Sequence, residues 1–97
     1  MVTLVSATGE VEWLDQFRLY PNPNTGIFTV EMTGDAQQEL EFVFYNVAGQ
    51  LVERTKLDFG TGELKHNFNY SHYPSGLYTL EIRSGISAMR VKVVIQR

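Results

Sequence analysis

Two histidines, His66 and His72, are the side chains of this sequence best suited to metal binding or proton transfer. They stand six residues apart, and no third ligand is spaced to complete a tetrahedral site with them. Ser71 and Ser75 place hydroxyl groups near these imidazoles. A hydrolytic triad also needs an orienting acid and an oxyanion hole, and no segment resembles the turn that carries a nucleophilic serine. These residues therefore favour neither a metal centre nor a hydrolase.

The acidic residues and the glycine turn give no stronger signal for catalysis. Glu39 and Glu41 fall on one face of an alternating segment, where solvent exposure is the simpler interpretation. The next carboxylates are scattered, not paired as in a glycosidase: Glu53, Asp58 and Glu63. The Gly60-Thr61-Gly62 turn has no helix pattern after it, which a phosphate-binding loop requires. We therefore predict that the chain is not an enzyme and has no catalytic residue, cofactor or metal.

Aromatic residues offer an alternative route to ligand binding. Trp13 could be a stacking platform for a sugar ring, or it could pack against the domain or against an upstream part of a longer protein. A small carbohydrate-binding or adhesive module of a surface protein would need exposed rings with polar groups beside them. The candidate platforms for such a module are Trp13, Tyr20, Tyr70 and Tyr73.

Composition limits the class of protein. A chain of 97 residues with 43% hydrophobic residues supports one domain with one core. Its net charge of −3 argues against a nucleic-acid binder, which presents a basic face. The absence of cysteine excludes disulfides and thiolate metal sites. No apolar run approaches the roughly 20 residues that span a bilayer. The basic residues gather late in the chain: Arg83, Arg90, Lys92 and Arg97.

Alternation of apolar and polar residues with a period of two runs through the chain and predicts β-strands. Residues 28–32 alternate strictly, whereas residues 40–45 are apolar enough to predict burial on both faces. No segment makes a convincing helix, and residues 35–40 are expected to form a loop or a single turn. The other alternating segments are 51–57, 64–70, 77–83 and 90–96, separated by turn signals at 48–49, 60–62, 74–76 and 84–85. We predict an all-β fold, an immunoglobulin-like antiparallel β-sandwich of about seven strands.

The segment from Leu19 to Val30 predicts a rigid corner that leads into a core strand. Pro21 and Pro23 each fix their own φ and hold the preceding residue out of helical geometry. Gly26 can supply a positive φ. The segment is therefore expected to be a specified turn and not a flexible linker.

Two further turns have local signatures. Asn46 and Gly49 predict a hairpin in which the glycine takes the left-handed conformation and the asparagine bonds the turn backbone. Tyr78, which follows the turn at 74–76, either forms the tyrosine corner of immunoglobulin-type domains or is an ordinary half-buried strand residue. In both interpretations, every second residue from Tyr78 to Ile82 should lie in the core.

Four segments, in this order, resemble the motifs of one known family: LYPNPNTGIFTV (19–30), NVAGQLV (46–52), PSGLYTLEI (74–82) and VKVVIQ (91–96). Through them, residues 17–97 resemble a type A C-terminal sorting domain of the type IX (Por) secretion system of the Bacteroidetes. The resemblance implies that residues 1–16 are an upstream linker or an extra edge strand. The residues that match the motifs are mainly structural: Tyr20, Pro21, Asn22, Pro23, Gly26, Phe28, Asn46, Gly49, Gln50, Gly76, Tyr78, Leu80 and Ile82.

The resemblance implies a delivery function. The folded domain would be recognised by the type IX components of the outer membrane, and a larger cargo protein would pass from the periplasm to the cell surface or the extracellular space. A sortase-like protease would commonly remove the domain. Residues 1–5 lack the basic start of a signal peptide, so we expect an export signal in a longer parent protein and an introduced start at Met1.

The last strand suggests a physical mechanism for this recognition. If it lies at a sheet edge, its free backbone groups offer a template for strand addition by a partner, or for a homodimer that need not be physiological. The alternative is a closing strand with a solvated lysine. The alternation points Val91, Val93 and Ile95 inward, and Lys92, Val94 and Gln96 outward. The proposed recognition residues are Val91, Lys92, Val93, Val94, Ile95, Gln96 and Arg97.

Overall fold

The computed structural model of the chain describes residues 3–4, 14–34, 39–60, 62–85 and 87–97. No helix occurs in these ranges, and thus none long and apolar enough to cross a membrane. The all-β prediction is confirmed. The described residues form eight strands: β1 (Thr3–Leu4), β2 (Leu14–Tyr20), β3 (Ile27–Gly34), β4 (Glu39–Tyr45), β5 (Leu51–Asp58), β6 (Glu63–Asn69), β7 (Gly76–Ser84) and β8 (Ser87–Ile95).

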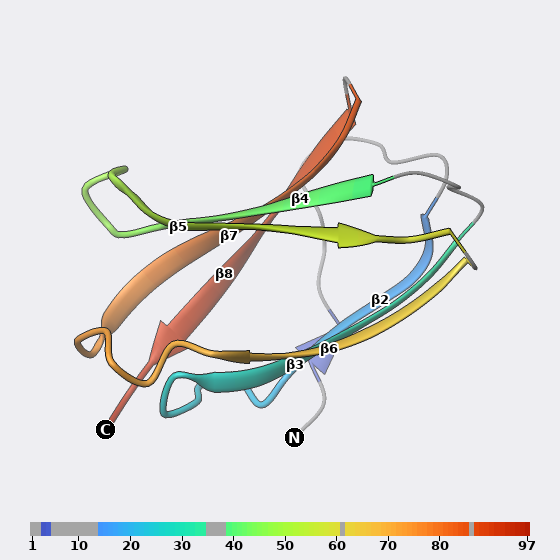
Figure 1. Cartoon of the computed structure of the whole chain (residues 1–97). Helices are drawn as coiled ribbons and strands as arrows, with labels where there is room; N and C mark the ends of the chain where they lie inside the picture. The colour runs from blue at the N-terminus through green and yellow to red at the C-terminus, as the bar shows by residue number, and fades with distance from the viewer. Residues whose placement is uncertain (1–2, 5–13, 35–38, 61, 86) are drawn as a thin grey trace.

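These strands form two antiparallel sheets that pack face to face (Figure 1). The first sheet has the order β1-β2-β3-β6, and the second has the order β5-β4-β7-β8. Lettered A, B, C, C′, E, F and G in chain order, β2 to β8 divide into the sheets A-B-E and C′-C-F-G. This is the division of an immunoglobulin-like sandwich, so the predicted architecture is confirmed.

The core lies between the two sheets and is built by the alternation along each strand. Phe28 and Phe44 come from opposite sheets and are 1% and 0% exposed, with ring centroids 6.3 Å apart. Strand β4 lies inside its sheet between β5 and β7, and its outward Val43 is also 0% exposed. Burial on both faces of this segment is therefore confirmed at Val43.

Strand β2 was not predicted by the alternation analysis. Phe17 and Leu19 are 4% and 0% exposed and pack into the core, while Arg18 between them is exposed. The period of two covers only Phe17 and Leu19 here, directly before the corner at Pro21. β2 starts at Leu14 and pairs with both β1 and β3. Trp13 lies outside the described residues, as do residues 35–38 of the expected loop, whereas Glu39 already belongs to β4.

The two predicted turn signatures are confirmed. The hydroxyl of Tyr78 donates to the carbonyl of Pro74 at 2.7 Å, which is the tyrosine corner at the start of the sixth sandwich strand. The side-chain oxygen of Asn46 accepts from the backbone nitrogens of Ala48 and Gln50, both at 3.0 Å. Gly49 has a φ of 81°. These local bonds fix the ends of β4, β5 and β7, which carry β8 at the edge of their sheet.

Candidate functional site

The terminal strand β8 lies at the edge of the second sheet and pairs only with β7 among the strands. Three of its proposed recognition residues are core residues: Val91, Val93 and Ile95 are 1%, 0% and 1% exposed. A partner of the folded domain cannot reach these three side chains. The proposed recognition surface therefore reduces to Lys92, Val94, Gln96 and Arg97, of which Val94 is half-buried and the others are exposed.

The backbone edge of β8 is occupied over its last residues. Asn22 donates from Nδ2 to the carbonyl of Lys92 and accepts at Oδ1 from the backbone nitrogen of Val94, both at 2.9 Å. The backbone of Asn24 donates to the carbonyl of Val94 at 2.9 Å and accepts from the nitrogen of Gln96 at 2.7 Å. We call these four bonds the asparagine clamp. The prediction of a free edge is wrong for this stretch, because a segment about 70 residues away in the sequence fills it.

The corner that carries the clamp is rigid, as predicted. Asn24 is 5% exposed; its side chain donates to the carbonyl of Pro21 at 2.9 Å and accepts from the nitrogen of Gly26 at 2.8 Å. Gly26 has a φ of 106°, and its carbonyl accepts from the nitrogen of Tyr70 at 2.7 Å. The peptide bonds before Pro21 and Pro23 are both cis. The motif analysis did not single out Asn24, although the repeated Pro-Asn pair marked the position.

The chain end is tied to the same corner. The Nε of Arg97 donates to the carbonyl of Thr25 at 3.2 Å, and its guanidinium also donates to the carbonyl of Ser71 in the turn between β6 and β7. Figure 1 shows the C terminus at the end of the sandwich where the corner before β3 and the turn before β7 also lie. The clamp and Arg97 therefore hold the last residues of the chain in one defined place.

Further back along β8, none of the four clamp bonds reaches Arg90, which lies in register with Glu81 of β7.

The outer face of the second sheet carries an ion-pair network around one buried carboxylate. Glu81 is 2% exposed and accepts from the Nε atoms of Arg83 at 2.6 Å and Arg90 at 2.9 Å. The hydroxyl of Tyr45 donates to the same carboxylate at 3.4 Å. The hydrogen bond from Arg83 to Glu81 raises the pKa of the arginine further above its ordinary value. Arg83 also lies 3.9 Å from the carboxylate of Glu41, which pairs with Arg54 at 3.2 Å, so the network joins three guanidinium groups to two carboxylates.

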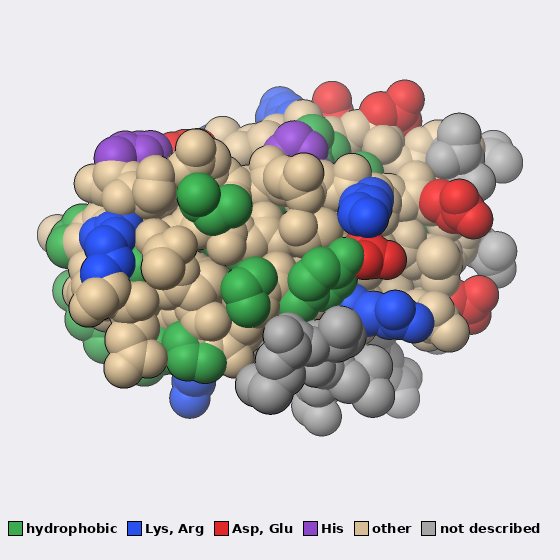
Figure 2. Space-filling view, turned by 90° about the horizontal axis from the view of Figure 1, so that it is seen from below, with side chains coloured by type: hydrophobic (Ala, Val, Ile, Leu, Met, Phe, Trp, Pro, Cys, Tyr) green, Lys and Arg blue, Asp and Glu red, His purple; other side chains and the backbone are tan. Residues whose placement is uncertain are grey.

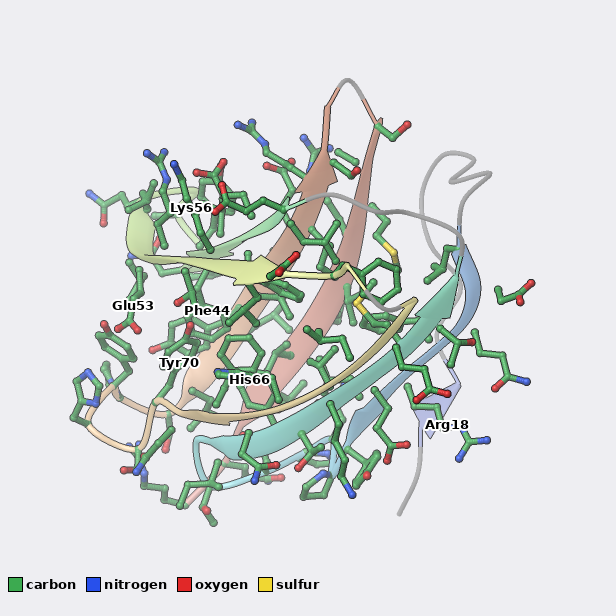
Figure 3. All side chains as sticks on the ribbon, turned by 45° about the vertical axis from the view of Figure 1, so that its right-hand side comes forward. Arg18, Phe44, Glu53, Lys56, His66 and Tyr70 are labelled. Atoms are coloured by element: carbon green, nitrogen blue, oxygen red, sulfur yellow. The ribbon has the colours of Figure 1, made fainter. Side chains whose placement is uncertain are left out.

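The candidate catalytic side chains do not converge. The ring of His66 packs edge-on against Phe68, with centroids 4.6 Å apart, and His72 lies against Tyr73 at 4.1 Å. Figure 3 shows His66 on β6, an edge strand of the first sheet, and Glu53 on β5, an edge strand of the second. In the described ranges, no group of three or more histidine, aspartate or glutamate side chains is placed to hold a metal ion.

The structure also separates the proposed sugar platforms. Tyr70 is 2% exposed and lies between the sheets near Phe44 (Figure 3), so it presents no ring face to solvent and its assignment as a platform is wrong. Burial raises the pKa of Tyr70 to about 12. Tyr73 is half-buried and donates to Glu53 at 2.5 Å, a bond that raises its pKa to about 12. Tyr20 is half-buried as well, and its hydroxyl bonds the carboxylate of Glu31.

Comparison with known proteins gives one family. The family model described as "Secretion system C-terminal sorting domain" matches residues 18–96. The match starts within β2 and ends one residue after β8, so it includes the corner, the clamp and the outward face of the terminal strand. No curated protein matches the chain.

Proposed function

The chain belongs to the family of type IX secretion C-terminal sorting domains, and from this premise we propose that it directs a larger cargo protein across the outer membrane to the cell surface or beyond. The cargo passes through the periplasm, the outer-membrane type IX components recognise the folded domain, and a sortase-like protease then removes it. Residues 1–16 lie on the cargo side of the domain as an upstream linker or an extra edge strand, and the pairing of β1 with β2 supports the edge strand. The family is not an enzyme family, and the domain acts by being recognised.

The observation that carries this proposal is the family match over residues 18–96, from within β2 through the terminal strand. We place the recognised surface on Lys92, Val94, Gln96 and Arg97. Their backbone is fixed by the clamp and by the alternate residues of β8, which are sealed in the core. A partner that reads these side chains meets a preorganised surface and pays little ordering entropy.

The test is export of a reporter in a host that has the type IX machinery. The reporter carries an ordinary signal peptide and is fused to the whole 97-residue chain. We expect the fusion in the medium or on the cell surface, and the reporter alone in the periplasm. Periplasmic retention of the fusion would contradict the sorting function.

A pair of lysine substitutions tests the recognised surface. Lys92→Gln removes a charge from the outward face of β8, and Lys65→Gln removes one from the outward face of β6 in the other sheet. Both lysines are exposed, so both variants should keep the melting temperature of the unmodified domain. We expect lower export for Lys92→Gln alone. Equal export of the two variants would show that Lys92 does not belong to the recognised surface. The proposed sorting function would stand.

A further inference from the structure

We infer that a second docking surface exists on this domain: a hollow beside the β4–β5 turn that receives an apolar, acid-bearing segment of a protein met during export. The inference rests on the proposed function, but it concerns a different surface. The hollow measures about 480 Å³ and is open to solvent. Its lining comes from the end of β4, the turn, and the outward faces of β7 and β8: Tyr45, Val47, Gly49, Leu77, Thr79 and Arg90.

Exposed apolar side chains gather at this hollow. Four large hydrophobic side chains are exposed among the described residues, and two of them line the hollow: Val47 at 78% and Leu77 at 39%. A third, Leu51 at 50%, lies beside it, in register with Tyr45 of the lining. The fourth, Ile27, is 50% exposed on the first sheet. A single exposed apolar residue is ordinary, whereas several around one concavity indicate a binding surface.

The fold does not require these side chains to be apolar. The turn is fixed by the side chain of Asn46 and the positive φ of Gly49, and both are independent of Val47. Leu77 faces outward next to the tyrosine corner, whose bond is made by Tyr78 on the opposite side of the strand. Polar residues at these positions would keep the same local bonds, so their apolar character points to contact with another molecule.

The surroundings of the hollow are basic. Arg90 lines it, and its side chain is 63% exposed although it also pairs with Glu81. Lys92 is exposed and lies in register with Thr79 of the lining. Glu81 and Glu41 offset two of the three charges of Arg54, Arg83 and Arg90, and together with Lys92 this group of side chains keeps a net positive charge.

The opposite face of the sandwich also carries charges of both signs. Figure 2 shows the outer face of the first sheet, where basic and acidic side chains lie next to one another. Positive charge around an apolar hollow selects a partner in which carboxylates flank an apolar side chain. A concavity of this size accommodates one protruding apolar side chain. The basic residues beside it match carboxylates that flank such a side chain in a protein segment, and this is the occupant that we infer.

The hollow is continuous with the outward face of the terminal strand. Leu77 lies in register with Val94, so the apolar surface runs from the turn to β8. One partner could bind both surfaces, and the hollow would then contribute apolar contact area while Lys92 and Arg90 contribute orientation.

Photocrosslinking in living cells tests this inference. A benzoylphenylalanine probe replaces Leu51 in the exported reporter fusion, and a matched fusion carries it at Ile27, which has the same 50% exposure. We expect an adduct with one envelope protein from the probe at position 51 and none from position 27. Mass spectrometry should place the bond in a segment of the partner that contains apolar and acidic residues.

Charge substitutions beside the probe test whether the partner segment is acidic. Arg90→Gln should lower the adduct yield about fivefold, as the loss of one exposed ion pair allows. Val47→Asp should lower the yield more than Val47→Lys does, because the added carboxylate repels an acidic partner. Position 47 is 78% exposed, so both changes leave folding intact and remain informative even if Arg90→Gln disturbs Glu81.

The contradicting outcomes are distinct. Equal adducts from the two probe positions, yields that do not respond to charge, or an adduct with lipid would overturn the inference. An adduct between two copies of this chain would assign the hollow to self-association and also overturn it. Export of the fusion with no adduct at position 51 refutes only the hollow, whereas failure of export refutes the sorting function as well.

Discussion

Replacing Asn22 with alanine should loosen the terminal strand, because this one side chain makes two of the four clamp bonds. It donates to the carbonyl of Lys92 and accepts from the nitrogen of Val94, each at 2.9 Å. A typical hydrogen bond contributes about 1 kcal/mol net to stability. Asn22 is half-buried, so water can reach the vacated edge and the desolvation penalty stays small. We expect Asn22→Ala to lower the free energy of unfolding by about 1–2 kcal/mol, or the melting temperature by about 5–10 °C.

Urea unfolding and hydrogen exchange measure this effect. The matched control is Asn67→Ala, in which an exposed strand asparagine loses one side-chain bond, from the hydroxyl of Thr29. The control should change the free energy of unfolding by less than about 0.5 kcal/mol. The amide of Val94 should exchange faster in Asn22→Ala, by more than the change in global stability explains. Equal unfolding free energies for the two variants, together with unchanged exchange at Val94, would refute the clamp as a stabilising element.

The remaining predictions concern the turns and a buried tyrosine. Gly26→Ala should destabilise by more than about 2 kcal/mol in urea unfolding, since its φ is 106° and a Cβ would lie 2.7 Å from a neighbouring backbone atom. Gly49→Ala should lose only about 1 kcal/mol, because nothing lies within 4 Å of its Cβ position; equal losses would contradict the steric argument. Tyr78→Phe should lose about 1 kcal/mol through the bond to Pro74, and an unchanged urea midpoint would show that this bond does not stabilise the fold. Burial raises the pKa of Tyr70 to about 12, so its neutral form is favoured in the folded state and the melting temperature should fall between about pH 10 and 12. Tyr70→Phe should remove the part of this fall in melting temperature that ionisation of Tyr70 causes. An unaltered dependence of the melting temperature on pH would contradict the raised pKa of Tyr70.

Local patterns in the sequence predicted most of the strands. Alternation placed Phe28, Val30, Phe42 and Phe44 in the core, and all four are buried. Strand β2 shows the limit of such patterns, because only Phe17 and Leu19 alternate before the two prolines, which by themselves indicate a corner. A strand with few alternating apolar residues forms because other strands pair with it, and those strands come from elsewhere in the chain.

The recognition surface was only partly predictable. The inward and outward directions on β8 follow from the period of two, which holds for any strand with one face on a core. Whether its edge was free did not follow, since Asn22 and Val94 are separated by 72 residues. The burial of Glu81 was equally unpredictable, because Arg90, which pairs with it, lies on a neighbouring strand.

The sequence by itself determined the features set within a few residues of the chain. These are the rigid corner at Pro21, the hairpin at Asn46, the bond that Tyr78 can make to nearby backbone, and the alternation of each strand. Tertiary structure decided which of these features meet: the corner closes on the end of β8, and the β4–β5 turn forms a hollow with Leu77. The physical reason is that short-range sterics and hydrogen bonds act along the chain, whereas edge pairing and surface concavity depend on how the two sheets pack.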